Sequence, residues 1–506
     1  MEVLMENLAE KELIALDHVQ IKSEQKVNMP AGAKKLMTVT CQLLNPKVEV
    51  NQSEIQVVGN LNTRLIFINE FDKYDSEEIS EVFEKKVTVK DYGGLCDIFA
   101  RVELMKSEWK ISDDKIEIDN SLMVHVWGVK SREMQVVGNL TGDVEVQKNE
   151  QLFLTFHSKL NDKFEISENI KLDNVCEGVL SVDVNPNLKD VISASGKVNL
   201  KGVMMVNILC VKTVDGTSVP YNMNHEIDFA KSVTVNGLTD EDIVCGVVNT
   251  NNVKMHIENS NDGAILVLSC DISFDARTYC NRKFNMVTDA ISFSKELTLQ
   301  TTQLNCVEIL PQVNTVVDIE NNLNIASNSG YISHVVAVEG MCVNNLQVNV
   351  TDNKALLEGV LGVNLLLENE EHLITGEHFD VPFQTSVRMD NLDRECVVDA
   401  SVVPLVVNAK ARRGTELLID AQLCVTVQAE TKKTVTVVNS LIEGQEKKDD
   451  GSAIQIYIIG EKENLWNLAK RTNLSCEALL QQNPNLENGC TPGERIVVYR
   501  YENVSL

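Results

Sequence analysis

The sequence predicts a mainly β protein, in which three tandem antiparallel domains of the β-sandwich or barrel type precede a small βααβ module. The first indication is the alternation of polar and apolar residues from about Val19 to Val438, seen clearly in residues 115–119 and 346–350. Such alternation places one set of side chains on a core and the other in water. The second indication is the turn chemistry between the apolar runs, as in Asn261–Gly263.

A domain-sized repeat supplies the third indication. The segment Phe83–Val89 is matched by Phe229–Val235 and again by Phe383–Met389, and an apolar strand that follows a glycine precedes each of them, at Gly59, Gly196 and Gly359. Three similar segments in the same order indicate tandem domains, because the period is too long for a solenoid. We therefore expect three domains, which are residues 1–145, 146–302 and 303–440.

The composition changes after the third domain. Residues 441–453 are rich in charged residues and predict a linker, and residues 454–500 predict the βααβ module. Its first strand covers Ile454–Ile459 and its last Arg495–Tyr499, while Asn464 and Ser475 are suited to cap the two helices between them.

Charge and motif content exclude several classes of function. The chain has 46 Lys and Arg against 74 Asp and Glu, and its formal net charge is -28. This charge disfavours binding to nucleic acids and to anionic membrane surfaces. The sequence has no phosphate loop, zincin helix or nucleophile elbow. We therefore expect a protein that is not an enzyme and needs no cofactor or metal.

The N-terminus and the cysteines indicate a cytoplasmic protein. Residues 1–6 are acidic where a signal peptide requires a basic region, and no apolar run approaches the length of a membrane span. The 13 cysteines are odd in number and lie mostly in apolar runs, which is typical of reduced, buried thiols. We expect no direct membrane insertion.

The C-terminal module resembles a LysM domain. The matching segments are Tyr457–Ile459, Leu465–Ala469, Asn483–Leu486 and Gly493–Val498. The resemblance implies a glycan groove formed by two loops, here Lys462, Glu463 and Asn464 with Asn483, Pro484 and Asn485. The first loop replaces the Gly-Asp-Thr common in the family, and glycine supplies a tight turn that lysine is not expected to supply. We therefore expect weak or absent glycan binding.

The three repeats resemble SPOCS domains, and three of these followed by one LysM domain resemble the clostridial spore coat morphogenetic family. The resemblance implies a mother-cell protein at the forespore surface that assembles the spore coat. It also implies that the LysM domain binds the coat scaffold ATPase, stage IV sporulation protein A. Two alternatives remain open, namely a LysM protein that binds peptidoglycan or N-acetylglucosamine, and a structural component of a phage-tail-like particle.

The first strand of the module suggests where a partner binds. Apolar residues occupy both faces of this strand, and the family match indicates that Tyr457 and Ile459 face the helices. Ile454, Ile456 and Ile458 then form an apolar outer row, which is unusual for a small sheet in water. Trp466 is either a core residue or a further anchor for the partner. We expect these four residues to form the partner-binding surface.

Overall fold

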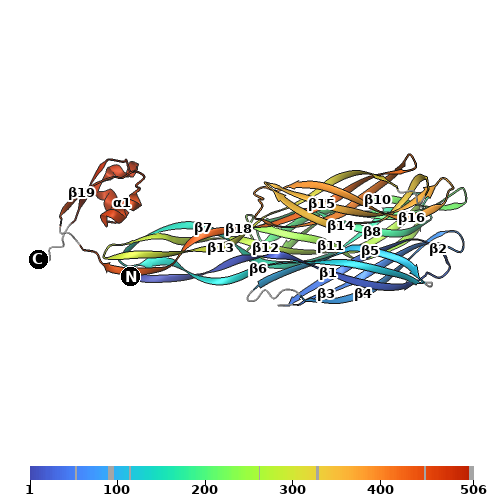
Figure 1. The fold of residues 1–506 in the computed structure, drawn as a ribbon, viewed down its shortest axis with the longest axis horizontal. Coiled ribbons are helices and arrows are strands. Elements are labelled where there is room, and N and C mark those ends of the chain that lie inside the picture. Colours follow the sequence, from blue (N-terminus) through green and yellow to red (C-terminus); the bar gives the residue numbers. More distant parts are fainter. Residues whose placement is uncertain are drawn as a thin grey trace.

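The computed structural model describes residues 1–500 except 52–53, 89–95, 113–114, 261–262, 326–329 and 449–451. The predicted mainly β class is confirmed, because long antiparallel strands make up nearly all of the described chain (Figure 1). The strands fall into three consecutive six-stranded units, which we call units 1, 2 and 3.

The strands of each unit follow one another along the chain. Unit 1 contains β1 (Glu2–Asn28), β2 (Ala33–Asn51), β3 (Glu54–Asn69), β4 (Tyr74–Thr88), β5 (Cys96–Ser112) and β6 (Lys115–Thr141). Unit 2 contains β7 (Val144–Lys171), β8 (Gly178–Ala194), β9 (Lys197–Val214), β10 (Thr217–Thr234), β11 (Ile243–Ser260) and β12 (Gly263–Ser292). Unit 3 contains β13 (Lys295–Asn324), β14 (Ile332–Thr351), β15 (Lys354–Asn369), β16 (Ile374–Arg388), β17 (Val397–Arg412) and β18 (Glu416–Glu446).

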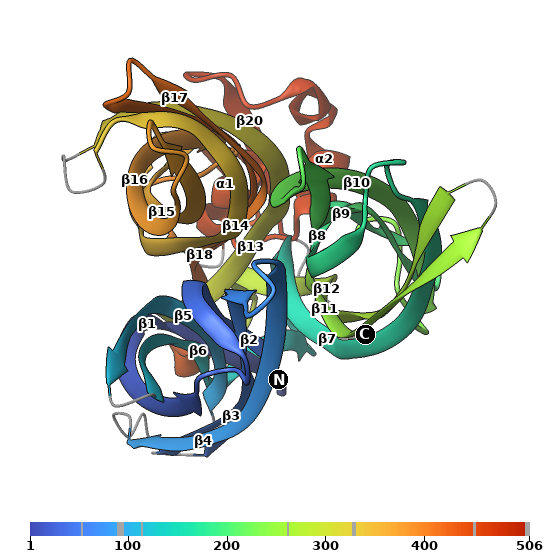
Figure 2. The same cartoon turned by 90° about the vertical axis from the view of Figure 1, so that its right-hand side faces the viewer.

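The three units share one topology. In each, the second, third and fourth strands form a meander, and the last strand lies between the first and the fifth. The two three-stranded sheets curve around an apolar core, and Figure 2 shows the three units side by side around a common centre. The same connection order in all three gives a structural counterpart to the sequence repeat.

A glycine–phenylalanine pair recurs at the same place in each unit. Phe83, Phe229 and Phe383 lie directly across the meander from Gly59, Gly202 and Gly359. Each phenyl ring covers its glycine so closely that a Cβ there would collide with it. Gly196, which the sequence shows before the apolar strand of unit 2, does directly precede β9, in a turn with φ 71°, but the position equivalent to Gly59 and Gly359 is Gly202. The pair explains why the repeat is most visible around these phenylalanines.

The first and last strands of each unit extend beyond its core into a shared stalk (Figure 1). Two turns, at residues 142–143 and 293–294, join the units at the tip of the stalk. All six long strands contribute apolar side chains to the interior of the stalk, which includes Leu8, Val136, Phe153, Met286, Leu304 and Val437. The units are thus packed together along their length.

Three of the predicted boundaries fall inside strands, and the division expected at residues 145–146 lies just inside β7. The division expected at residues 302–303 lies within β13, and the linker expected over 441–453 begins within β18. The backbone of β18 stays paired with β13 until Glu446 meets Lys295, despite the charged composition of this segment. Residues 449–451 of the expected linker lie outside the described residues.

The C-terminal module, residues 454–500, has the predicted βααβ order. It consists of β19 (Ile454–Ile458), α1 (Leu465–Thr472), α2 (Cys476–Gln482), a 3-10 helix (Pro484–Asn488) and β20 (Arg495–Tyr499). Asn464 and Ser475 cap the two α-helices, as expected. Its core is formed by Ile459, Leu468, Leu479, Leu486, Ile496 and Val498.

Two further observations concern membranes and thiols. Among the described residues, no helix is both long and apolar enough to cross a bilayer. Each cysteine whose side chain the structure describes is free of disulfide bonds, and most of these thiols are buried.

Candidate partner-binding surface

The outer face of the module's two-stranded sheet is apolar and open to solvent. Ile454, Ile456 and Ile458 are 59%, 66% and 57% exposed. The intervening Tyr457 and the following Ile459 pack on the helices, so the strand has the orientation that its sequence indicates. Exposed branched apolar side chains in a row are unfavourable in water unless another surface covers them.

The second strand extends this apolar face. In the antiparallel register, Ile454 lies opposite Tyr499, Ile456 opposite Val497, and Ile458 opposite Arg495. Tyr499 is exposed and Val497 is half-buried. We call Ile454, Ile456, Ile458, Val497 and Tyr499 the apolar face of the module. Arg495 gives it a basic edge.

Trp466 lies on the other side of the module. The indole is half-buried, and its Nε1–H donates a hydrogen bond of 2.8 Å to Asp289 Oδ2 of β12. Lys470, one turn further along α1, places its Nζ 2.5 Å from Asp289 Oδ1. The structure therefore does not bring Trp466 together with the isoleucine row. It uses Trp466 to attach the module to the stalk.

Further hydrogen bonds complete this attachment. Asn473 Nδ2 donates to the carbonyl of Phe293 at 2.8 Å, and the backbone N–H of Cys476 donates to Glu145 Oε2 at 2.9 Å. Lys447 Nζ bridges Ser292 O and Asn473 Oδ1, at 2.7 Å each. The helical side of the module thus faces the tip of the stalk, while β19 lies on the side farther from the body (Figure 1).

The first loop of the expected glycan groove keeps a tight turn without glycine. Lys462 adopts φ 62°, which is the left-handed region, so the expectation that lysine does not supply this turn is wrong. Glu463 Oε2 accepts the backbone N–H of Gly460 at 2.8 Å and pairs with Arg471 at 3.0 Å. Asn464 caps α1. The side chains of Glu463 and Asn464 therefore stabilise the module internally.

The second loop is also held by hydrogen bonds within the module. Asn483 is buried, donates from Nδ2 to the carbonyl of Val497 at 2.8 Å, and accepts the N–H of Val497 on Oδ1 at 2.8 Å. Pro484 begins the 3-10 helix, and Asn485 donates to Glu494. Asn483 thus holds the loop against β20, because its side-chain amide is hydrogen-bonded to the backbone of that strand.

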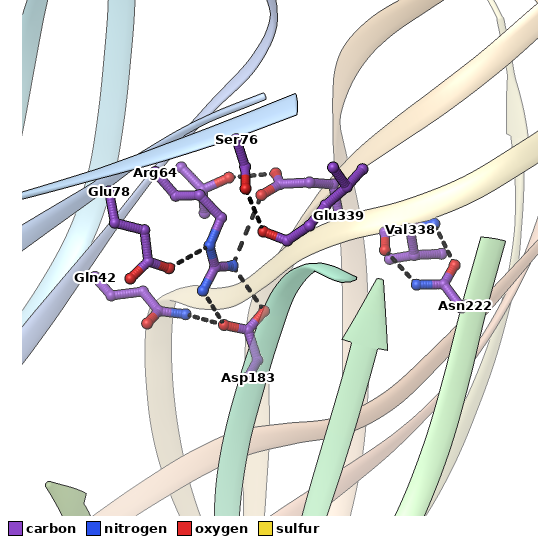
Figure 3. Close-up of polar contacts among 10 residues, drawn as sticks. Gln42, Arg64, Ser76, Glu78, Asp183, Asn222, Val338 and Glu339 are labelled. Carbon is purple, nitrogen blue, oxygen red and sulfur yellow. Dashed lines mark hydrogen bonds and ion pairs between the residues drawn. The ribbon is translucent and has the colours of Figure 1, made fainter. Parts of the chain in front are cut away.

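A buried ionic cluster joins the three units at the end of the body opposite the stalk (Figure 3). Arg64 of unit 1 donates from Nη2 to Asp183 Oδ1 of unit 2 at 3.0 Å, and its Nη1 lies 3.8 Å from Glu339 Oε1 of unit 3. Arg64 Nε also donates to Glu78 at 2.9 Å, and Thr40 donates to Glu339. Sequence reasoning missed this cluster, since its members are dispersed over 299 positions, from Thr40 to Glu339.

The pKa values of the cluster's charged groups reflect both burial and the neighbouring opposite charges. Burial alone would lower the pKa of Arg64, but the charges of Asp183 and Glu339 outweigh it and raise the pKa above its usual value. Burial raises the pKa of Glu339, against the opposing charge of Arg64. Beside it, the Asn222 amide pairs with both the N–H and the C=O of Val338 at 2.7 Å each. The cluster fixes the orientation of the units that present the module.

Comparison with known families gives one match. The family described as SipL, SPOCS domain, matches residues 175–259, which span β8 to β11 of unit 2. The chain is thus similar to SPOCS proteins in this unit, and the similarity links it to sporulation. Neither the curated proteins nor the solved structures compared with the chain give a significant match.

Proposed function

We propose that this chain is a non-enzymatic spore coat assembly protein of the mother-cell cytoplasm, recruited to the forespore surface. Its LysM-like module, residues 454–500, binds the coat scaffold ATPase, stage IV sporulation protein A. The SPOCS match in unit 2 supports the sporulation role. The apolar face of the module is the observation that carries the assignment of a protein partner.

The apolar face has the chemistry of a protein interface. Its three isoleucines would be desolvated by a partner, and each fully covered side chain of this size contributes about 1.5–3 kcal/mol. Tyr499 and Arg495 at the margin belong to residue types enriched at interfaces. A glycan would instead require convergent polar groups, and this face presents few of them.

The charge of the module also favours protein binding. Between Ile454 and Arg500 the five acidic residues 461, 463, 477, 487 and 494 balance the five basic residues 462, 470, 471, 495 and 500. The whole charge of -28 therefore lies outside the module. A neutral module at the stalk tip approaches an acidic partner without the repulsion that the body would impose.

The test is binding of purified stage IV sporulation protein A to the full chain. Ile456→Lys should weaken binding at least tenfold, because it places a charge at the centre of the apolar face. Val82→Lys, at a similarly exposed valine of β4, is the matched control and should bind as the wild type does. Wild-type affinity for both Ile456→Lys and Ile454→Lys, with the fold intact by circular dichroism, would refute the assignment.

One observation favours a second candidate, namely peptidoglycan binding. The left-handed turn at Lys462 retains the backbone shape for which the family commonly uses glycine. Saturable retention of the chain on purified sacculi, lost when the glycan strands are digested, would support this function. Because Glu463, Asn464 and Asn483 already have internal hydrogen-bond partners, we expect little retention.

A further inference from the structure

Unit 2 has an open sheet edge that the proposed function does not use. β11 is the edge strand of the sheet β11-β12-β7, and its only strand partner among the described residues is β12. Residues 252–258 of β11 are exposed throughout. Figure 2 shows this yellow-green hairpin projecting sideways from the body. An exposed edge strand presents unpaired N–H and C=O groups that can accept another strand.

The side chains of this edge are apolar on one face and charged on the other. Met255 and Ile257 are 42% and 41% exposed. Lys254, His256 and Glu258 alternate with them and are also exposed. Unit 1 has a comparable edge on β5, where Trp109 and Ile111 are 38% and 54% exposed, whereas the corresponding end of β17 in unit 3, residues 408–412, has no exposed large apolar side chain.

The segment from Lys254 to Glu258 is complementary to itself in the antiparallel direction. If two copies pair with His256 opposite His256, each Lys254 faces Glu258 of the other copy and each Met255 faces Ile257. One pair of opposite charges and one apolar contact are then each made twice, and such cross-strand pairs stabilise a sheet. An edge without this symmetry would not match a second copy of itself.

The alternative register is less favourable. Centring the pairing on Met255 would place Lys254 opposite His256 and Glu258 opposite Asn252. Asn252 has φ 51°, which departs from the extended conformation, and its side chain is bonded to Asp271 at 2.7 Å. The charges and this irregularity therefore select the register centred on His256.

We propose that β11 is a dimerisation edge at which a second copy of this chain adds its own β11 in antiparallel orientation, centred on His256. The two three-stranded sheets would join into one six-stranded sheet across a twofold axis. In the single chain, Glu258 lies 3.1 Å from His256, and in the dimer it would face Lys254 of the other copy. The contact lies on unit 2 and leaves the apolar face of the module free.

The test is a charge swap in the full chain, followed by sedimentation equilibrium over a concentration series. Lys254→Glu and Glu258→Lys should each raise the dimer dissociation constant at least tenfold, because each places like charges opposite one another. The double variant carrying both changes should restore dimerisation. Lys410→Glu, at an exposed lysine near the end of β17, is the control with the same charge change and should dimerise as the wild type does.

A cysteine at the twofold axis tests the register. His256→Cys should give a covalent dimer that a reducing agent dissolves, because residues directly opposite in a sheet lie within disulfide range. The wild type, oxidised in the same way, shows how much covalent dimer the natural cysteines form. A wild type that is monomeric at every concentration, or a folded double variant that does not regain dimerisation, would overturn the proposal.

Discussion

Arg64 and Asp183 form a two-pronged ion pair between unit 1 and unit 2. Arg64 Nη1 lies 3.2 Å from Asp183 Oδ2, and Nη2 lies 3.0 Å from Oδ1. Gln42 donates a further hydrogen bond to Asp183 at 2.8 Å. Paired geometry of this kind fixes orientation as well as distance. The pair therefore holds two units in register at the end of the body opposite the stalk.

Removing Arg64 should destabilise the body strongly. Arg64→Met leaves the carboxylates of Asp183 and Glu339 without their buried cation, which costs about 3–5 kcal/mol in typical cases. Arg388→Met is the control, because its ion pair with Asp390 is exposed and is expected to contribute about 0–1 kcal/mol. Urea denaturation of both variants measures the difference, and equal midpoints would contradict the structural role of Arg64.

The glycine–phenylalanine pairs should behave as coupled residues. Phe383→Ala removes a ring that packs in the core of unit 3 and should cost about 3–5 kcal/mol. Gly359→Ala should also destabilise, because its Cβ would collide with that ring.

A double-mutant cycle measures the coupling. Gly359→Ala should cost less in the Phe383→Ala background than in the wild type, since the ring is then absent. Gly178→Ala, where a Cβ meets no atom within 4 Å, should change stability little. Additive costs at positions 359 and 383 would show that the ring and the glycine are independent.

Glu103 predicts a specific dependence of stability on pH. Burial alone would raise the pKa of Glu103, but the His125 imidazole, with Nε2 3.3 Å from Glu103 Oε2, and the charge of Arg101 outweigh it and lower the pKa below its usual value. Arg101 lies 3.0 Å from Glu103 and also pairs with Asp399 of unit 3 at 3.3 Å. Glu103 therefore belongs to a second link between units.

The sign follows from linkage. A carboxyl whose pKa is lowered by folding stabilises the protein fully above its unfolded pKa, and this stabilisation is lost as the pH falls through the folded pKa. Glu103→Gln should therefore destabilise the chain at pH 7 and much less at pH values below the folded pKa. Thermal unfolding of both proteins across this range is the measurement. If the difference in stability between the wild type and Glu103→Gln does not change with pH, the lost stability comes from packing and not from the charge of Glu103.

The fold class was predictable because the strands alternate regularly and the segment around Phe83, Phe229 and Phe383 recurs in each unit. The stalk was not, because β13 runs as one strand from the stalk into unit 3, and the local breaks in its alternation do not mark the boundary between units. Nothing in the local pattern marks the turn at residues 293–294, which contains neither glycine nor proline. The boundary was therefore placed too late, at residues 302–303.

The orientation of the isoleucine row was predictable because strand parity is a local property. The role of Trp466 was not, because its partner Asp289 lies 177 positions away in the sequence. Lys462 shows a third case, in which a lysine adopts a turn conformation that residue preference assigns to glycine. Local sequence patterns thus predicted the strands, but they did not predict the contacts between units or those between the module and the stalk.

The attachment of the module to the stalk should depend on Asp289. Asp289→Ala removes the acceptor for both Trp466 and Lys470, and hydrogen bonds to a charged group contribute about 1.5–3 kcal/mol. The module should then detach more often, and limited proteolysis between β18 and β19 should become at least tenfold faster. Trp466→Phe should give a smaller increase, because it removes only the indole N–H. Asp275→Ala, further along β12, should leave the rate unchanged, and wild-type resistance of Asp289→Ala would show that the other tip contacts suffice.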